Sequence, residues 1–202
     1  MFNDFKGYDA SASSIKISAL PTLLISAISV IDDHRKVVSM DFKIAGDLIY
    51  VLKPCTSNTV LDAEANLALY RNVQTALEQN LVASSITINR GGLAMALTRS
   101  SMSGKLGVDI DYKSSNLFTE TPGQILVSID PSKKLEFEAW FPGDQLDNIG
   151  IVKDNKDNII IREDNNIILE LSIEEALKAY RSKFANYLYE AKDTKLAEEI
   201  GR

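Results

Sequence analysis

Apolar stretches alternate along the chain with polar, turn-forming segments, and the spacing inside each stretch predicts its secondary structure. Residues 1–18 have no apolar period and are expected to form an extended or poorly ordered arm. Residues 22–31 are almost continuously apolar over the length of one strand, which predicts a buried strand covered on both faces. A second strand is predicted at 46–53. A helix over 62–79, capped by Asp62, follows from apolar residues at helical spacing: Ala65, Leu69, Val73, Ala76 and Leu77.

The second half of the chain continues this alternation. A strand is predicted at 81–88, and apolar positions at helical spacing then predict a helix that starts after Gly92 and ends near Gly104. Strands are expected at 106–112 and 123–130, and Asp130 followed by Pro131 predicts the start of a helix that ends near Trp140. Three short β segments follow, separated by Asp, Asn and Lys turns suited to hairpins: 147–153, 158–163 and 166–171.

The last predicted helix opens with Ser172 and Glu175, which form a capping-box pattern. One side of this helix is apolar and is expected to pack along the sheet: Ile173, Ala176, Leu177, Tyr180, Phe184, Tyr187 and Leu188. No linker rich in proline or in glycine and serine divides the chain. We therefore predict one α+β domain over 19–190, with helices against a mixed sheet, preceded by the arm at 1–18 and followed by a tail at 191–202.

Composition narrows the classes of partner. The chain has 202 residues, 45% of them hydrophobic, and a net charge of −6 with scattered basic residues, so nucleic acid is not an expected partner. The longest apolar run, at 20–31, is too short to cross a bilayer, and acidic residues precede it near the N-terminus, so neither a membrane nor a secretory signal is expected. We predict a cytoplasmic protein. Its abrupt start, with turn-forming residues that lead into a strand, is typical of a domain excised from a longer chain.

Residues with catalytic or metal-binding chemistry do not form a recognisable set. The chain contains one cysteine, Cys55, and one histidine, His34, so a common zinc site or a nucleophile paired with a histidine is not expected. Asp109 and Asp111 share one face of a predicted strand and have the spacing of a magnesium pair, but acids at strand ends are usually solvated. The acidic run at 154–158 lacks the glycine and distal glutamate of a calcium loop and is interpreted as a hairpin turn. We therefore predict neither catalytic nor metal-ligating residues.

The corner between the strand at 81–88 and the following helix is the candidate binding site. Gly91 and Gly92 open the helix, and free N–H groups at a helix N-terminus attract anions. Asn89 is positioned to cap the helix, and Arg90 to make a bidentate contact with a phosphate. A glycine pair before a helix is also common as a plain turn, and both interpretations stay open from spacing alone.

Four stretches carry a resemblance to a known family. The segment from "NDFKGYD" to "DLIYVL" resembles the phosphoribosylformylglycinamidine synthase family where that enzyme enters its last large domain. "LDAEANLALYRNVQTALEQNLVASS", "GGLAMALTRSSMSGKLGVDID" and "LFTETPGQILVSI" follow in the order of the family. The resemblance extends to about residue 182. It implies an α+β, three-layer α/β/α fold with a mixed sheet, like the C-terminal domain of aminoimidazole ribonucleotide synthase.

The resemblance also implies a function for the parent enzyme. That enzyme uses ATP and magnesium to activate the amide of formylglycinamide ribonucleotide, and ammonia from glutamine then gives formylglycinamidine ribonucleotide. This chain resembles the C-terminal domain of its second half, so the implied partners are the remaining domains and the glutaminase domain or subunit. The isolated domain is expected to be inactive and to hold no cofactor firmly. The alternatives are a degenerate structural or regulatory domain of that synthase, or another member of the same ATP-binding superfamily.

Two departures from the family affect the site. Where the family has His-Asp-x-Ser-Asp-Gly-Gly, this chain has residues 86–92, "ITINRGG", so the histidine and both aspartates are absent while the glycine pair is kept. The expected phosphate- or nucleotide-binding residues are Thr87, Asn89, Arg90, Gly91 and Gly92. The second departure lies between Leu52 and Asp62, where the glycine-rich loop of the family is replaced by a short segment. Either this loop is deleted, or a stretch is missing from the chain as numbered.

Overall fold

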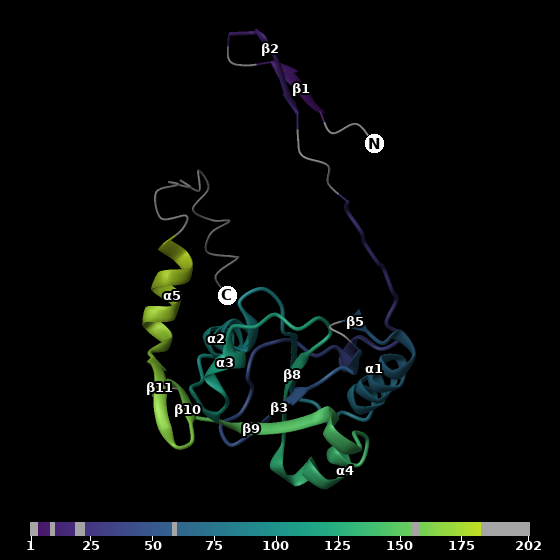
Figure 1. Ribbon diagram of the computed structural model, residues 1–202, viewed down its shortest axis with the longest axis vertical. Helices are drawn as coiled ribbons and strands as arrows, with labels where there is room; N and C mark the ends of the chain where they lie inside the picture. Colours follow the sequence, from purple (N-terminus) through teal and green to yellow (C-terminus); the bar gives the residue numbers. More distant parts are fainter. Residues whose placement is uncertain (1–3, 9–10, 19–22, 58–59, 155–157, 183–202) are drawn as a thin grey trace. The chain divides into compact units, whose positions relative to one another are not determined.

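The computed structural model describes residues 4–8, 11–18, 23–57, 60–154 and 158–182. Contacts divide the chain into two compact units, Met1–His34 and Arg35–Arg202. In the first unit, β1 (Asp4–Tyr8) and β2 (Ser14–Ser18) pair antiparallel as a hairpin, with Lys6 opposite Lys16 (Figure 1). The described part of the arm expected at 1–18 thus contains a two-stranded hairpin, which the sequence did not predict.

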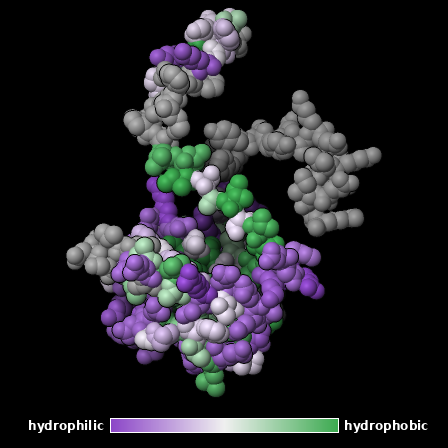
Figure 2. All heavy atoms as spheres, turned by 90° about the vertical axis from the view of Figure 1, so that its right-hand side faces the viewer, coloured by the Kyte–Doolittle hydropathy of each residue, from purple (hydrophilic) through white to green (hydrophobic). Residues whose placement is uncertain are grey.

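The prediction of a buried strand at 22–31 is wrong for residues 23–31, the part of this range that the structure describes. Residues 23–31 are assigned no secondary structure and are exposed. The side chains of Ile28 and Val30 are 96% and 87% exposed. Figure 2 shows such hydrophobic atoms on the molecular surface. An apolar run shows that its residues suit burial, but burial also requires a neighbouring layer, and no described segment of this unit covers residues 23–31.

A seven-stranded sheet forms the centre of the second unit. Its strand order is β11-β10-β7-β9-β3-β8-β6. Neighbouring strands pair antiparallel except β7 and β10, which are parallel, so the mixed sheet is confirmed. The bounds are β3 (Leu48–Leu52), β6 (Ser84–Thr87), β7 (Val108–Asp111), β8 (Ile125–Ile129), β9 (Leu146–Val152), β10 (Ile159–Glu163) and β11 (Asn166–Leu171).

The predicted α-helices are present with two differences. The α-helices are α1 (Ala63–Glu78), α2 (Gly92–Gly104), α3 (Ser114–Leu117), α4 (Lys134–Glu138) and α5 (Ile173–Ser182). The single-turn α3 was not predicted. The helix expected from Asp130 to Trp140 is instead a 3-10 turn, Pro131–Lys133, continued by the short α4. Three-residue 3-10 turns also occur at His34–Lys36 and Gly143–Gln145.

Several predicted helix starts are confirmed by side-chain hydrogen bonds. Asp62 accepts from the Glu64 N–H at 3.1 Å, and Asp130 accepts from the Ser132 N–H at 2.8 Å. The capping box of α5 is complete, because the Glu175 N–H donates to Ser172 Oγ (3.1 Å) and the Ser172 N–H donates to Glu175 Oε2 (3.2 Å). The predicted continuation of this helix through Phe184, Tyr187 and Leu188, and the tail at 191–202, lie outside the described residues.

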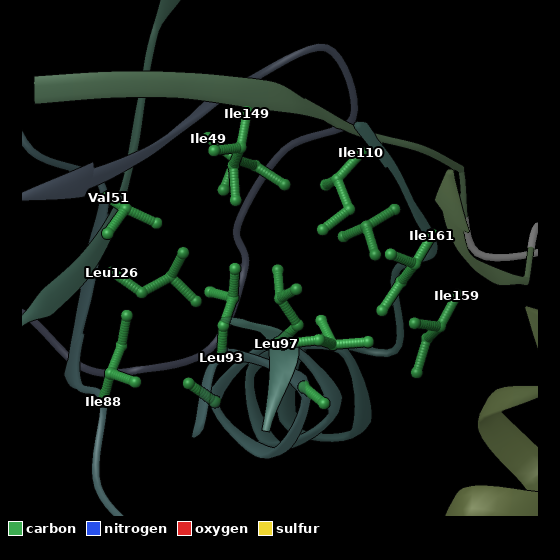
Figure 3. Packing of buried hydrophobic residues seen from close by; sticks show 14 of the residues in the cluster. Ile49, Val51, Ile88, Leu93, Leu97, Ile110, Leu126, Ile149, Ile159 and Ile161 are labelled. Atoms are coloured by element: carbon green, nitrogen blue, oxygen red, sulfur yellow. The ribbon is translucent and has the colours of Figure 1, made fainter. Parts of the chain in front are cut away.

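Alternating side chains of β3 divide the core into two layers. Ile49 and Val51 point toward Leu93 and Leu97 of α2 (Figure 3). On the other face, Tyr50 and Leu52 pack with α1 and α4, through residues such as Leu69, Val73 and Phe137. The Tyr50 hydroxyl donates to Glu138 Oε1 at 2.9 Å, which satisfies a phenol in a fully buried side chain. Helices therefore cover both faces of the sheet, as the three-layer prediction requires.

Of the two hairpins predicted for the last three strands, one is confirmed and the other is wrong. β10 and β11 form a hairpin through Asp164 and Asn165, which have φ values of 50° and 68°, the left-handed geometry that asparagine and aspartate tolerate. The hairpin predicted between β9 and β10 is wrong, because β7 lies between these two strands in the sheet, and residues 155–157 of the turn predicted at 154–158 lie outside the described residues. β10 thus pairs with a strand about fifty positions earlier in the sequence, a partner that local turn signals do not indicate.

The connection between β3 and α1 is short in this chain. It contains the two-residue strands β4 (Thr56–Ser57) and β5 (Val60–Leu61), which pair antiparallel. Leu52 and Asp62 are separated by the same short segment in the full sequence, and the glycine-rich loop expected from the resemblance is not present between them.

Candidate functional site

The corner at 87–92 joins the edge strand β6 to α2. Thr87 ends the strand, and the Ile88 N–H donates to the Gln124 backbone oxygen at 2.9 Å, which anchors the corner to the segment before β8. Asn89 and Arg90 are exposed. The Asn89 amide donates to Thr87 Oγ1 at 3.0 Å, so these two predicted residues do lie together.

Asn89 does not cap α2, which corrects the prediction from its position. The N-cap is Gly91, with φ 88° and ψ 7°, and no side chain bonds to the helix start. The Gly92 N–H donates to the Asn89 backbone oxygen at 2.9 Å. Asn89 therefore closes the turn through its backbone, and one of the amides considered for an anion already has a partner inside the protein.

The two glycines have conformational and steric reasons to be glycine. Both have positive φ, 88° at Gly91 and 65° at Gly92, which side chains rarely adopt. A Cβ atom on Gly92 would lie 2.6 Å from the carbonyl carbon of Phe118 and 2.7 Å from the backbone oxygen of Leu117. The pair thus permits a tight turn and close packing of α2 against α3, whether or not an anion binds.

The acidic residues considered for a metal do not form a cluster. Asp109 forms a bidentate ion pair with Arg162 on the neighbouring strand, with 2.8 Å from Nε to Oδ1 and 3.3 Å from Nη2 to Oδ2. The hydrogen bond to Asp109 raises the pKa of Arg162, and the negative charges of Asp109, Glu170 and Asp111 raise it further. Within the described part of the chain, no group of three or more His, Cys, Asp or Glu side chains is placed to hold a metal ion.

A polar cavity of about 620 Å³ lies at one end of the sheet, and the sequence did not indicate it. Its lining combines both signs of charge, including Lys53, Lys113, Asp111, Asp147 and Glu163. Gln124, which anchors the corner, also lines it, so the cavity lies beside the strand that leads into the corner. These residues come from the ends of separate strands, and only the strand order brings them together.

Charge and burial in this cavity act on Tyr112. Lys53 Nζ lies 2.9 Å from Asp147 Oδ1, a pair separated by 94 positions in the sequence. Burial of Tyr112 raises the pKa of its phenol, and the negative charge of Asp147 raises it further. Tyr112 therefore stays protonated at neutral pH and can donate a hydrogen bond to a ligand in the cavity.

No helix among the described residues has both the length and the apolar composition needed to cross a membrane.

Comparison with known proteins gives one family of relatives. No family model matches the chain. The PurL subunit of phosphoribosylformylglycinamidine synthase from Thermoanaerobacter sp. (strain X514) is 29% identical over 191 residues, covering 81% of this chain and 25% of the relative. The PurL subunit from Lactobacillus acidophilus is 30% identical over 166 residues, covering 71% of this chain and 22% of the relative. The chain thus spans about a quarter of the length of these curated relatives.

Solved structures share the fold. The crystal structure of phosphoribosylformylglycinamidine synthase II from Thermotoga maritima matches with a TM-score of 0.62 and 16% identity, over 71% of this chain and 28% of that one. T. maritima PurL complexed with ATP matches with a TM-score of 0.63 and 17% identity, over 71% and 27%. The hydrogenase maturation protein HypE matches with a TM-score of 0.54 and 16% identity, over 71% and 56%.

These matches identify the class of protein and then a particular relative. The chain is an α+β protein with a mixed sheet of the kind found in PurL and HypE. In sequence, its curated relatives are PurL, so the chain is similar in both sequence and fold to a part of the PurL subunit of phosphoribosylformylglycinamidine synthase. The resemblance found from the sequence stretches is confirmed.

Proposed function

We propose that this chain is the C-terminal domain of the second half of an ATP-dependent, amidine-forming ligase. The parent enzyme would convert formylglycinamide ribonucleotide to formylglycinamidine ribonucleotide with ammonia derived from glutamine. The observation that carries this proposal is 28–30% sequence identity to PurL subunits over 67–82% of the chain. The proposed partners are the remaining domains of the synthase and its glutaminase domain or subunit, in the cytoplasm.

The proposed role of this domain is to support the nucleotide cleft, while the chemistry is carried out elsewhere. The corner lacks the histidine and both aspartates that the family pattern has, so it offers no titratable group for proton transfer. The described residues offer no cluster for magnesium. ATP and magnesium would therefore be held by other parts of the parent enzyme, and the isolated domain would be inactive.

A phosphate contact at the corner is a separate part of the proposal. Arg90 is an exposed cation next to the N-terminus of α2, and the bond from Asn89 to Thr87 places an amide and a hydroxyl beside it. The Gly92 amide is already bonded, so the contact would depend on the Arg90 guanidinium and on other backbone N–H groups of the turn. This makes the expected affinity modest.

Activity of the chain alone tests the assignment of chemistry. The 202-residue protein is incubated with formylglycinamide ribonucleotide, ATP, magnesium and either glutamine or ammonium, and the amidine product is measured by chromatography. No product is expected. Turnover by this chain alone would show that catalytic groups lie within it. Rescue of a purine auxotroph that lacks PurL, by the reading frame that contains this chain, tests the family function.

Titration with ADP tests the phosphate contact. Saturable binding to the wild-type chain is expected, and the dissociation constant of Arg90→Ala should be at least tenfold higher. The control is Arg71→Ala, which removes an exposed arginine from α1 and should leave ADP binding unchanged. Equal affinity in the wild type and both variants would place ADP elsewhere or show only non-specific attraction.

The second candidate is a degenerate domain that holds the synthase together without binding a nucleotide. The specific observation in its favour is the corner itself, where the Gly92 amide is occupied and the glycine pair is explained by close packing against α3. Absence of ADP binding together with purine rescue by the parent frame would favour this candidate. Other members of the ATP-binding superfamily are less well supported, since the likeness to HypE extends to the fold alone.

A further inference from the structure

An apolar cavity of about 390 Å³ lies between α2, the β10–β11 hairpin and α5. Each of these three elements contributes side chains to its wall, among them Met95 and Met102 of α2, Ile161 and Leu169 of the hairpin, and Ala179 and Tyr180 of α5. Met95 and Tyr180 are 39% and 61% exposed, so the cavity is open to solvent at this rim. Its volume falls in the range of roughly 300–1,000 Å³ that is usual for small-molecule sites.

The lining offers almost no polar or charged partner. Two side-chain hydroxyls line it, Thr98 and Tyr180, and no charged side chain does so. The Thr98 hydroxyl donates to the backbone oxygen of Ala94 at 2.7 Å, within its own helix, and that donor is unavailable to a ligand. A phosphate, nucleotide or other ion would lose its hydration in this cavity without gaining a counter-charge. The chemistry therefore selects an uncharged, apolar occupant.

We propose that this cavity is a binding site for a small, uncharged, apolar molecule, aromatic or aliphatic. The site is independent of the proposed ligase function, because none of the ligands of that reaction is apolar. Gly91 also lines the cavity, so an occupant would contact the turn that precedes α2 from its apolar side. Burial of the apolar surface of the occupant against methionine, isoleucine and leucine side chains supplies the binding free energy.

N-phenyl-1-naphthylamine, a neutral fluorescent probe, tests this site in the full 202-residue chain. Saturable enhancement of fluorescence with one probe per chain is expected. Ala179→Phe should weaken binding at least tenfold, because Ala179 is an exposed helix residue whose enlarged side chain fills the cavity. The matched control is Ala139→Phe at the end of α4, which adds the same ring at an exposed position outside the cavity and should leave binding unchanged.

A second variant tests the same site independently, so the experiment stays decisive if Ala179→Phe does not fold. Met95→Glu places a charge at the exposed rim on a residue type that suits a helix, and it should also weaken binding at least tenfold. The exposed apolar residues 23–31 are the same in every variant, so non-specific probe binding there does not distinguish them. Non-saturable binding, or equal affinity in all four proteins, overturns the proposal. A dimer in light scattering that Ala179→Phe dissociates, without saturable probe binding, also overturns it and assigns the cavity to a second copy.

Discussion

The side chain of Asn66 bonds to both backbone groups of Cys55. Its amide oxygen accepts from the Cys55 N–H at 2.8 Å, and its amide nitrogen donates to the Cys55 carbonyl oxygen at 2.7 Å. The same nitrogen also donates to the backbone oxygen of Asp62. Asn66 is 1% exposed, whereas Cys55 is exposed, so these bonds join a buried side chain to a segment at the surface. One buried amide on α1 thus ties down both ends of the shortened connection between β3 and α1.

Replacement of Asn66 should therefore destabilise the protein strongly. Asn66→Ala removes both side-chain bonds to the Cys55 backbone and leaves only the bond from the Asp62 N–H to the Cys55 oxygen, so a loss of about 1–3 kcal/mol in the free energy of unfolding is expected. Urea unfolding followed by circular dichroism measures this loss. Gln74→Ala on the exposed face of the same helix is the control and should change the free energy by no more than about 0.5 kcal/mol. Similar losses in both variants would mean that the bonds of Asn66 stabilise the protein no more than an exposed side chain of the same helix does.

The two glycines of the corner lead to a prediction about close packing. Gly92→Ala places a Cβ atom within 2.6–2.8 Å of backbone atoms of Leu117 and Phe118, in addition to the cost of positive φ. Gly143→Ala also has positive φ, 74°, but meets no atom within 4 Å. Thermal and urea unfolding should show a loss of about 1 kcal/mol for Gly143→Ala and more than about 3 kcal/mol for Gly92→Ala. Equal losses would show that α2 does not pack closely on α3.

The sequence predicts the parts of this site that depend on residues close together in the chain, and it misses the parts that depend on residues far apart in the chain. The strand, the glycine pair and the start of α2 were all predicted near Gly91, because turn chemistry and helical period act over a few residues. The bond from the Gly92 N–H to Asn89, and the backbone of Phe118 against Gly92, could not be predicted, since they depend on turn geometry and on a later helix. The polar cavity was missed for the same reason: Lys53 and Asp147 meet only because β3 and β9 are neighbours.

Fold prediction failed where burial and pairing are decided by distant elements. The run at 23–31 has the composition of a buried strand, yet Ile28 and Val30 are exposed within the unit described. The strands β9 and β10 were predicted correctly, but β7 separates them, because β10 pairs in parallel with β7. By contrast, the second strand predicted at 46–53 is confirmed as β3, and the structure adds that Ile49 and Val51 lie in one core cluster while Tyr50 and Leu52 lie in the other.

The buried carboxyl group of Asp47 should lower the free energy of unfolding more at neutral pH than at acid pH. Its side chain is 3% exposed and its Oδ2 atom has no hydrogen-bond partner. Burial, helped by the negative charge of Asp130, raises the pKa of Asp47 above its usual value. Because the folded-state pKa is the higher one, the charged form opposes folding at neutral pH, and this penalty is relieved as the pH falls through the folded-state pKa.

Asp47→Asn should therefore raise the urea midpoint at pH 7, and the gain should shrink as the pH approaches 4. The comparison is Asp130→Asn, at an exposed carboxylate whose pKa is lowered by hydrogen bonds from Ser132. That substitution removes a contribution that is present above the unfolded-state pKa, so its loss should be largest at neutral pH and vanish in acid. Unfolding curves at several pH values check both slopes. A gain for Asp47→Asn that grows in acid would mean that the buried carboxylate is stabilised as an anion.

The attachment of α5 gives the last prediction. Because α5 forms one wall of the apolar cavity, its first turn affects that site as well as local stability. Ser172→Ala removes the acceptor of the Glu175 N–H, and a local loss of about 1 kcal/mol is expected. Hydrogen exchange of the amides in α5 should accelerate about fivefold, while exchange in α1 stays unchanged.

Hydrogen bonds from Ser172 lower the pKa of Glu175, so this stabilisation is present at neutral pH and is lost as the pH falls through the folded-state pKa. A drop in the protection factors of the wild-type α5 amides on acidification, and no drop in Ser172→Ala, would assign the effect to this pair, whereas an equal drop in both proteins would contradict it.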